Sequence, residues 1–206
     1  MEGEYIHAPV PDASSDAALR QAVDALERTG LLFLHDARRP SVSTLLAGEA
    51  IRGSWWGHPA GRRIFQVVSA IEEQGLALFV PLLSAKVTLV HRRLWPALLS
   101  VGEARERWQM DPLTDRAREL LAEVDRAGRV RSSGPSSKAL ARALLVLAEQ
   151  VHTRGGAHAT ELVAWPAVRE QRGLTGRMDV DDARRSLEEA AERLDALSAL
   201  PWVRGR

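Results

Sequence analysis

The chain has 206 residues, of which 45% are hydrophobic, so it is long enough to bury one medium-sized core or two small ones. It contains no cysteine, which excludes disulfides, thiolate metal sites and a cysteine nucleophile and fits a reducing compartment. No apolar stretch approaches the ~18 residues that a membrane span needs, and the acidic N-terminus does not resemble a secretory signal. We therefore expect a cytoplasmic protein with no membrane partner.

The formal net charge is only +1, so the whole chain does not have the composition of a nucleic-acid-binding protein. The charge is unevenly distributed, however. Residues 1–50 contain four arginines and eight acidic residues, whereas residues 51–110 contain eight basic and four acidic residues. Because a local field steers a polyanion, the middle segment is the candidate contact, and a solvated surface is the alternative.

The first elements follow from apolar spacing and from capping residues. Ser14 or Ser15 can cap a helix whose apolar residues recur at spacings of three and four, and Gly30 ends it. The run LLFL at 31–34 has the length of a strand. Ser41 can then cap a short helix that extends through about Gly48.

The next elements complete a recognisable order. Pro59 suits the first turn of a third helix, which has one apolar face and ends near Gly75. The runs LALFVPLL at 76–83 and KVTLVH at 86–91 are separated by two residues, which predicts a β-hairpin with its tip at 84–85. Helix, strand, helix, helix, strand, strand is the order of a winged helix, which is a helix-turn-helix with an added hairpin.

Part of this pattern occurs twice. The segments LWPALL at 94–99 and VAWPAVR at 163–169 each follow a hairpin-like pair of runs and share Trp-Pro-Ala. Upstream, ALERTGLLFL at 25–34 corresponds to EVDRAGRVRS at 123–132, since each is a helix that ends at glycine and enters an extended segment. The repetition predicts a duplicated architecture.

We therefore predict an α+β, mainly helical fold of tandem winged-helix units with small β-hairpins and a C-terminal helix. The first unit covers residues 13–102, a second unit shortened by one helix covers 112–174, and the C-terminal helix covers 180–199. Asp179 caps that last helix, and its acidic first turn suits the helix dipole. Its single apolar stripe normally packs on its own chain, and pairing of two chains is the alternative.

Three segments within residues 30–172 carry a resemblance to a known family. The chain resembles the AlkZ-type (YcaQ-like) winged-helix DNA glycosylases in the segments GSWWGHP, LLSAKVTLVHRRLWPALL and EQVHTRGGAH. The resemblance implies tandem winged helices and a link to DNA repair, because those enzymes excise alkylated bases or unhook interstrand crosslinks. Their catalytic Gln-x-Gln pair positions the hydrolytic water, and no two glutamines of this chain are separated by one residue. We therefore expect no catalytic residue of that type.

The winged-helix architecture predicts a role in DNA binding for the stretch GSWWGHPAGRR at 53–63. In a winged helix the third helix enters the major groove and the wing contacts the backbone or the minor groove. Of the two adjacent tryptophans, at least one is expected in the core, and a wedge facing the groove is the alternative for the other. We predict DNA contacts at the turn, the third helix and the wing: Arg52, Trp56, His58, Arg62, Arg63, Lys86, Arg92 and Arg93.

The sequence also suggests a candidate metal site and a candidate general base. His152 and His158 flank a glycine turn, with Glu149 and Glu161 on the same predicted hairpin, but solvated side chains are the favoured interpretation over a metal site. Asp36 after the first strand has the chemistry of a general base, although aspartate at such a position more often bonds the local backbone. We therefore predict no metal and no cofactor.

The sequence thus favours a non-catalytic, duplex-DNA-binding winged-helix protein. One alternative is a glycosylase-like enzyme that acts on alkylated or crosslinked bases. The other is a winged-helix protein-interaction module, with a protein partner or a homodimer, which the near-neutral charge favours.

Overall fold

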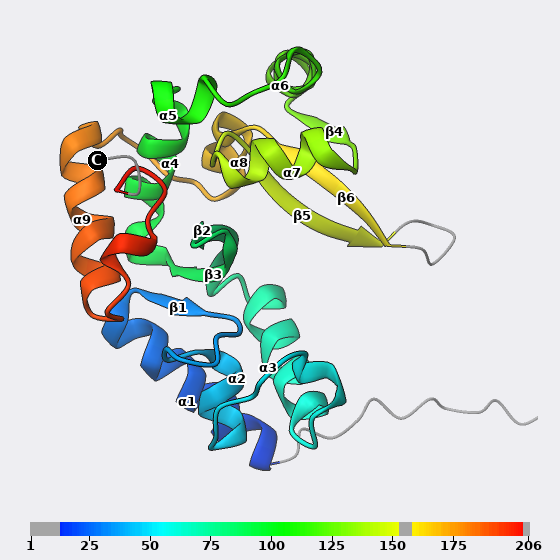
Figure 1. Ribbon diagram of the computed structural model, residues 1–206, viewed down its shortest axis with the longest axis vertical. Coiled ribbons are helices and arrows are strands. Elements are labelled where there is room, and N and C mark those ends of the chain that lie inside the picture. Colours follow the sequence, from blue (N-terminus) through cyan, green and yellow to red (C-terminus); the bar gives the residue numbers. More distant parts are fainter. Residues whose placement is uncertain (1–12, 153–157, 204–206) are drawn as a thin grey trace, which may run out of the picture.

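A computed structural model describes residues 13–152 and 158–203 of the chain. Helices predominate, and the strands form two small antiparallel sheets, so the fold is α+β and mainly helical, as predicted. Figure 1 shows the two sheets one above the other, with helix α9 (Val180–Glu192) running along one side. Within the described ranges, no helix combines the length and the apolar character needed to cross a bilayer.

The described residues of the N-terminal half form four α-helices, three strands and two short 3-10 turns. In chain order these are α1 (Ala13–Thr29), β1 (Leu31–Phe33), α2 (Val42–Ala47), the 3-10 turn η1 (Trp55–Gly57), α3 (Gly61–Glu73), β2 (Ala77–Leu83), β3 (Lys86–His91), η2 (Arg92–Leu94) and α4 (Trp95–Glu103). Ser41 caps α2 through a capping box with Thr44, as its position before an apolar run predicted.

The second half contains a shorter version of the same series. Its elements are α5 (Arg107–Met110), α6 (Asp115–Ala127), β4 (Arg129–Arg131), α7 (Pro135–Arg142), β5 (Leu147–His152), β6 (His158–Val163) and α8 (Trp165–Gln171). The chain then continues into α9 (Val180–Glu192) and the 3-10 turn η3 (Leu197–Ala199). The series helix, short strand, helix, hairpin and Trp-Pro-Ala helix therefore occurs twice.

The two sheets have the same topology. Their strand orders are β1-β3-β2 and β4-β6-β5, and every pairing is antiparallel, so in each sheet the short first strand pairs with the last strand of the hairpin. Leu31 lies opposite Val90 in the first sheet, and Arg129 lies opposite Val163 in the second. The predicted tip at Ser84 and Ala85 is confirmed, since both residues have the positive φ that two-residue hairpin turns require.

The two Trp-Pro-Ala tryptophans are both buried at the start of a helix. Trp95 Nε1 donates to the Val90 carbonyl at 2.9 Å, and Trp165 Nε1 donates to the Leu144 carbonyl at 2.7 Å, so each indole bonds to its own half of the chain. Both belong to the largest apolar core, which joins the two halves and α9. Smaller cores lie beneath α1–α3 and between α6 and α7.

Helix α4 lies at the centre of that shared core. Its residues from Ala97 to Gly102 are all buried, and both α8 and α9 pack against it. A Cβ added at Gly102 would lie 2.2 Å from Nε1 of Trp165. Glycine at this position therefore allows the Trp165 indole to lie directly against the helix backbone.

The C-terminal helix is shorter than the predicted 180–199. Asp179 caps it by accepting bonds from the Asp181 and Asp182 amides, as expected, but α9 ends at Glu192. The continuous apolar period suggested a longer helix, whereas Asp195 adopts a positive φ of 51° and turns the chain back toward the core. The apolar stripe of α9 packs on α4 of the same chain.

We expect Gly102→Ala to lower the free energy of unfolding by about 1–3 kcal/mol, because the new methyl group overlaps the Trp165 ring and forces α4 and α8 apart. Gly57→Ala is the matched control, since no atom lies within 4 Å of the position of its Cβ. Urea unfolding of both variants measures the difference. A Gly102→Ala protein as stable as the Gly57→Ala protein would contradict this account of the core.

Candidate nucleic-acid interface

The segment from Ser54 to Ala60, here called the tryptophan turn, is a tight 3-10 turn. The Ser54 hydroxyl accepts a bond from the Trp56 amide at 3.4 Å, and the His58 amide donates to the Trp55 carbonyl at 3.1 Å. The His58 ring then accepts a bond from the Ala60 amide at 3.2 Å. The side chains of Ser54 and His58 thus accept hydrogen bonds from backbone amides of a turn that is too short to satisfy them as a regular helix does.

Two contacts fix the position of this turn. The His35 ring bonds through Nε2 to the Gly53 carbonyl at 2.8 Å and through Nδ1 to the Ser43 hydroxyl at 2.7 Å, which holds the incoming loop beside β1 and α2. On the outgoing side, a Cβ on Gly61 would lie only 2.9 Å from the Trp55 carbonyl oxygen. Helix α3 therefore begins in direct contact with the turn.

The two adjacent tryptophans have different environments. Trp55 is only 8% exposed and belongs to the core beneath α1–α3, which confirms the prediction of a buried ring. Trp56 is 66% exposed and stacks on Trp55, with ring centroids 4.1 Å apart and an interplanar angle of 22°. Phe65 on α3 is 49% exposed and lies 5.7 Å from the Trp56 centroid. The turn therefore presents an exposed aromatic pair, Trp56 and Phe65, supported by a buried ring.

Exposed arginines accompany this aromatic pair. Arg62 and Arg63 lie in the first turn of α3, and Arg52 lines a shallow pocket with Ser54 and His58 beside the tryptophan turn. In the described part of the chain, these three guanidinium groups make no ion pair or hydrogen bond. Glu49 instead lies 3.2 Å from the His58 ring. The surface around the turn is therefore positively charged.

Helix α3 is electrostatically asymmetric. Its N-terminal turn carries Arg62 and Arg63, whereas its last turn carries Glu72 and Glu73. Burial raises the pKa of Glu72, and the nearby carboxylates of Glu149 and Glu73 raise it further. A polyanion therefore approaches the N-terminal half of α3 more favourably than the C-terminal half.

Lys86 lies at a different place, next to the loop that follows β1. Its Nζ lies 2.7 Å from Oδ2 of Asp36, which is only 4% exposed. Oδ1 of Asp36 accepts bonds from the Arg38 and Arg39 amides at 2.8 and 3.1 Å. Burial acts to raise the pKa of Asp36, but the bonds from Lys86 and from these amides outweigh it and hold the pKa below its ordinary value. Asp36 is therefore the turn residue that was favoured over a general base.

The tip of the β2–β3 hairpin, which is the predicted wing, packs on the C-terminal segment. The Ser84 amide donates to the Ala199 carbonyl at 2.8 Å. Nearby, the Arg39 guanidinium donates to the Asp195 carbonyl at 3.0 Å. The tip therefore has an intramolecular contact in addition to the Lys86 ion pair at its base.

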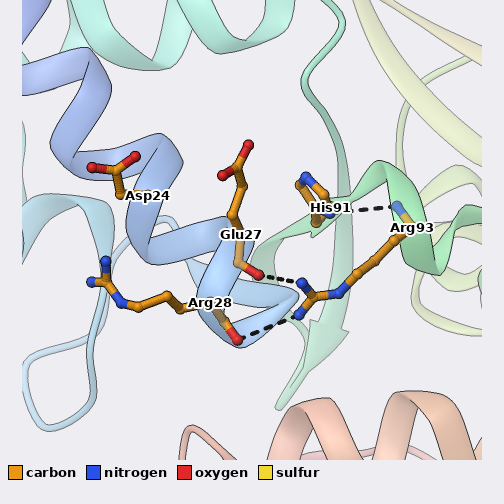
Figure 2. A pocket seen from close by; sticks show the side chains of 5 residues that line it. All are labelled: Asp24, Glu27, Arg28, His91 and Arg93. Carbon is orange, nitrogen blue, oxygen red and sulfur yellow. Dashed lines mark hydrogen bonds between the residues drawn. The ribbon is translucent and has the colours of Figure 1, made fainter.

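Arg93 lies at the end of α1. Figure 2 shows its guanidinium pointing at the last turn of that helix, where it donates to the Glu27 carbonyl and, at 3.4 Å, to the Arg28 carbonyl. An open pocket between α1 and the end of β3 is lined by both Arg93 and His91, and the His91 ring accepts a hydrogen bond from the Arg93 amide. Burial lowers the pKa of His91, and the positive charge of Arg93 adds to that effect. Arg93 thus satisfies the terminal carbonyls of a helix, although both Arg92 and Arg93 are exposed.

The structure therefore divides the eight predicted contacts among three places. Five of them lie in the tryptophan turn, just before it or at the start of α3, namely Arg52, Trp56, His58, Arg62 and Arg63. Lys86 lies beside Asp36, and the 3-10 turn after β3 carries the last two. The sequence-based prediction did not include Phe65. This residue lies outside the apolar stripe of α3, and an aromatic residue on the polar side of a predicted helix is the signal that could have identified it.

The carboxylates of the second hairpin are used in ion pairs. Arg129 Nη1 lies 2.9 Å from Glu161 and 3.8 Å from Glu149, so both carboxylates that were weighed as metal ligands face a cation instead. The side chains of His152 and His158 lie outside the described part. Among the residues that are described, no group of three or more potential ligands has a geometry that could hold a metal ion.

Comparisons with known proteins add no relative: no model of a known family matches the chain, and neither a curated protein nor a solved structure matches it.

The different environments of Trp55 and Trp56 predict losses of stability of very different size. We expect Trp55→Ala to lower the free energy of unfolding by about 3–5 kcal/mol, because it leaves a cavity in the core. Trp56→Ala serves as its matched control and should cost less than about 1 kcal/mol, since the ring is largely in water already. Chemical denaturation measures both values, and similar losses in the two variants would disprove the assignment of the buried ring.

The Asp36–Lys86 pair predicts a pH dependence. Since the folded-state pKa of Asp36 is depressed, its stabilisation is present above the ordinary value of 3.8 and is lost as the pH falls through the folded-state pKa. We expect Asp36→Asn to lower the free energy of unfolding at pH 7 by about 1–2 kcal/mol through loss of the ion pair. That difference should shrink at pH 3.

Urea titrations at the two pH values measure this change. Glu119→Gln, which removes an exposed ion pair with Arg116, is the control and should have an effect below about 0.5 kcal/mol at both. An Asp36→Asn effect of equal size at pH 7 and pH 3 would show that the carboxylate charge is unimportant.

Proposed function

We propose that this protein binds duplex DNA through the tryptophan turn and the N-terminal half of α3. The observation that carries the proposal is a group of exposed arginines at and beside the first turn of α3 that have no ion-pair partner among the described residues, namely Arg52, Arg62 and Arg63. Phosphate contacts supply most of the affinity of a duplex-binding protein, and arginine is the side chain best suited to them.

The proposal treats each half of the chain as a winged-helix unit. In the first unit, α1, α2 and α3 precede a three-stranded sheet of order β1-β3-β2, and α3 is the element that this architecture presents to the major groove. The charge asymmetry of α3 supports entry by its N-terminal end, because the carboxylates of Glu72 and Glu73 then stay away from the phosphates.

Individual roles follow from this orientation. Arg62 and Arg63 occupy consecutive positions of the first turn, so one can reach a phosphate while the other reaches a guanine edge. Gln66 is exposed one turn further along and has the amide that suits an adenine edge. Lys86 has a weaker role, because the Asp36 carboxylate already compensates its charge. A link to DNA repair rests only on the resemblance to the AlkZ-type enzymes.

One observation favours a protein partner as the second candidate. Trp56 and Phe65 form an exposed aromatic pair beside arginines, and tryptophan and arginine are also enriched at the centres of protein interfaces. The two candidates differ in salt dependence, because only a DNA contact releases condensed counterions in proportion to the phosphates neutralised.

We therefore expect a measurable salt slope. If Arg52, Arg62 and Arg63 each neutralise one phosphate, the slope of log K against log salt is about −2.7, and a change from ~50 to ~200 mM salt weakens binding about 40-fold. The double variant Arg62→Ala/Arg63→Ala should flatten the slope by about 1.8 without loss of stability, since exposed arginines contribute little to folding.

Fluorescence anisotropy with a random-sequence duplex measures this slope. The control is the double variant Arg116→Ala/Arg126→Ala, which removes the same charge from the exposed surface of α6 and should bind like the parent. The absence of binding at ~50 mM salt, or an equal loss of binding in both double variants, would refute the proposed face.

A further inference from the structure

The aromatic pair of the tryptophan turn is not required by the proposed contacts to phosphates and groove edges. Trp56 is 66% exposed and Phe65 is 49% exposed, and with Val87 on the β2–β3 hairpin they are the large hydrophobic residues exposed in the described chain. Exposure of such side chains is unfavourable in water, and a contiguous exposed pair marks a contact surface.

The ring of Trp56 is held rigidly in this exposed position. Trp55 fills the core beneath it and covers one of its faces at a centroid distance of 4.1 Å, so Trp56 has no space in which to turn inward. The backbone is fixed as well, because Ser54 caps the turn and Gly61 leaves no gap between the turn and α3. A rigid aromatic side chain loses little conformational entropy when it binds a partner.

The surroundings indicate the chemical class of that partner. Arg52, Arg62 and Arg63 have no ion-pair partner within the described ranges, so this surface suits a partner that carries negative charge next to a flat apolar group. A nucleotide has both features, because its phosphate pairs with arginine and its base stacks on an aromatic ring.

An intact duplex does not offer that base, since paired bases are already stacked on their neighbours. Taking a base out of the stack costs a few kcal/mol, and the cost is least for a base that is unpaired or mismatched. Resting on the proposed function, we infer that Trp56 and Phe65 receive an unpaired base, and that the protein prefers a duplex interrupted by such a base to an intact duplex.

The test compares two duplexes of the same flanking sequence, one intact and one with a single-nucleotide bulge, by anisotropy at a fixed ~100 mM salt. A stacked base adds enough affinity for about tenfold tighter binding of the bulged duplex. Trp56→Leu and Phe65→Leu should each reduce the ratio of the two affinities, whatever their effect on the affinity for the intact duplex. Neither should change the salt slope, because neither removes a charge. Val87→Ala is the control, because it shortens an exposed apolar residue on the hairpin and should keep the preference.

The outcomes separate this inference from the proposed function. Equal affinity for the two duplexes, with the expected salt slope, overturns the inference and leaves duplex binding in place. A preference that persists in both leucine variants also overturns it. No binding to either duplex removes the proposed function together with the inference. Circular dichroism checks folding, and if Trp56→Leu misfolds, Phe65→Leu decides the result, since Phe65 lies outside the core.

Discussion

The contact between Gly102 and Trp165 is the constraint on which the arrangement of this protein depends. Helix α4 is buried along almost its whole length, because other elements pack against it on several sides. The indole of Trp165 reaches the α4 backbone where a methyl group would overlap it, and α9 covers another side. The two halves of the chain are thus joined by tight packing of apolar side chains, which is sensitive to changes of a single carbon atom.

The tryptophan turn shows how a packed core can support an exposed aromatic surface. Trp55 provides the packing that anchors the turn, and Trp56, the next residue, is left at the surface because the chain reverses within a single 3-10 turn. Adjacent side chains therefore separate the structural task from the proposed binding task. His35 adds to this division, since its two ring bonds secure the preceding loop without occupying the exposed surface.

Much of the fold was predictable from local sequence signals. The β2–β3 hairpin with its tip at Ser84 and Ala85, the cap at Ser41 and the helix end before Gly30 all depend on residues close in sequence, and all agree with the structure. The length of the last helix was wrong, because the reversal at Asp195 depends on packing against a distant core rather than on local preference.

The candidate site was predictable only in part, and the reason is distance along the chain. The residues of the tryptophan turn are neighbours in sequence and remain together in space. Lys86, by contrast, is paired with a carboxylate 50 residues earlier, and Arg93 bonds to the end of a helix 66 residues earlier. No periodicity or motif encodes such partners, so charge alone did not distinguish an available cation from an occupied one.

The attachment of the hairpin tip to the C-terminal segment has a consequence for how the protein is made. The largest core contains Leu31 and Phe33 from the first sheet together with Leu200 and Trp202 from the last residues described. During synthesis on the ribosome, the first sheet therefore completes this packing only after the segment around Leu200 and Trp202 has been made. Contacts between segments so far apart in the sequence slow folding and leave apolar surface exposed in the meantime.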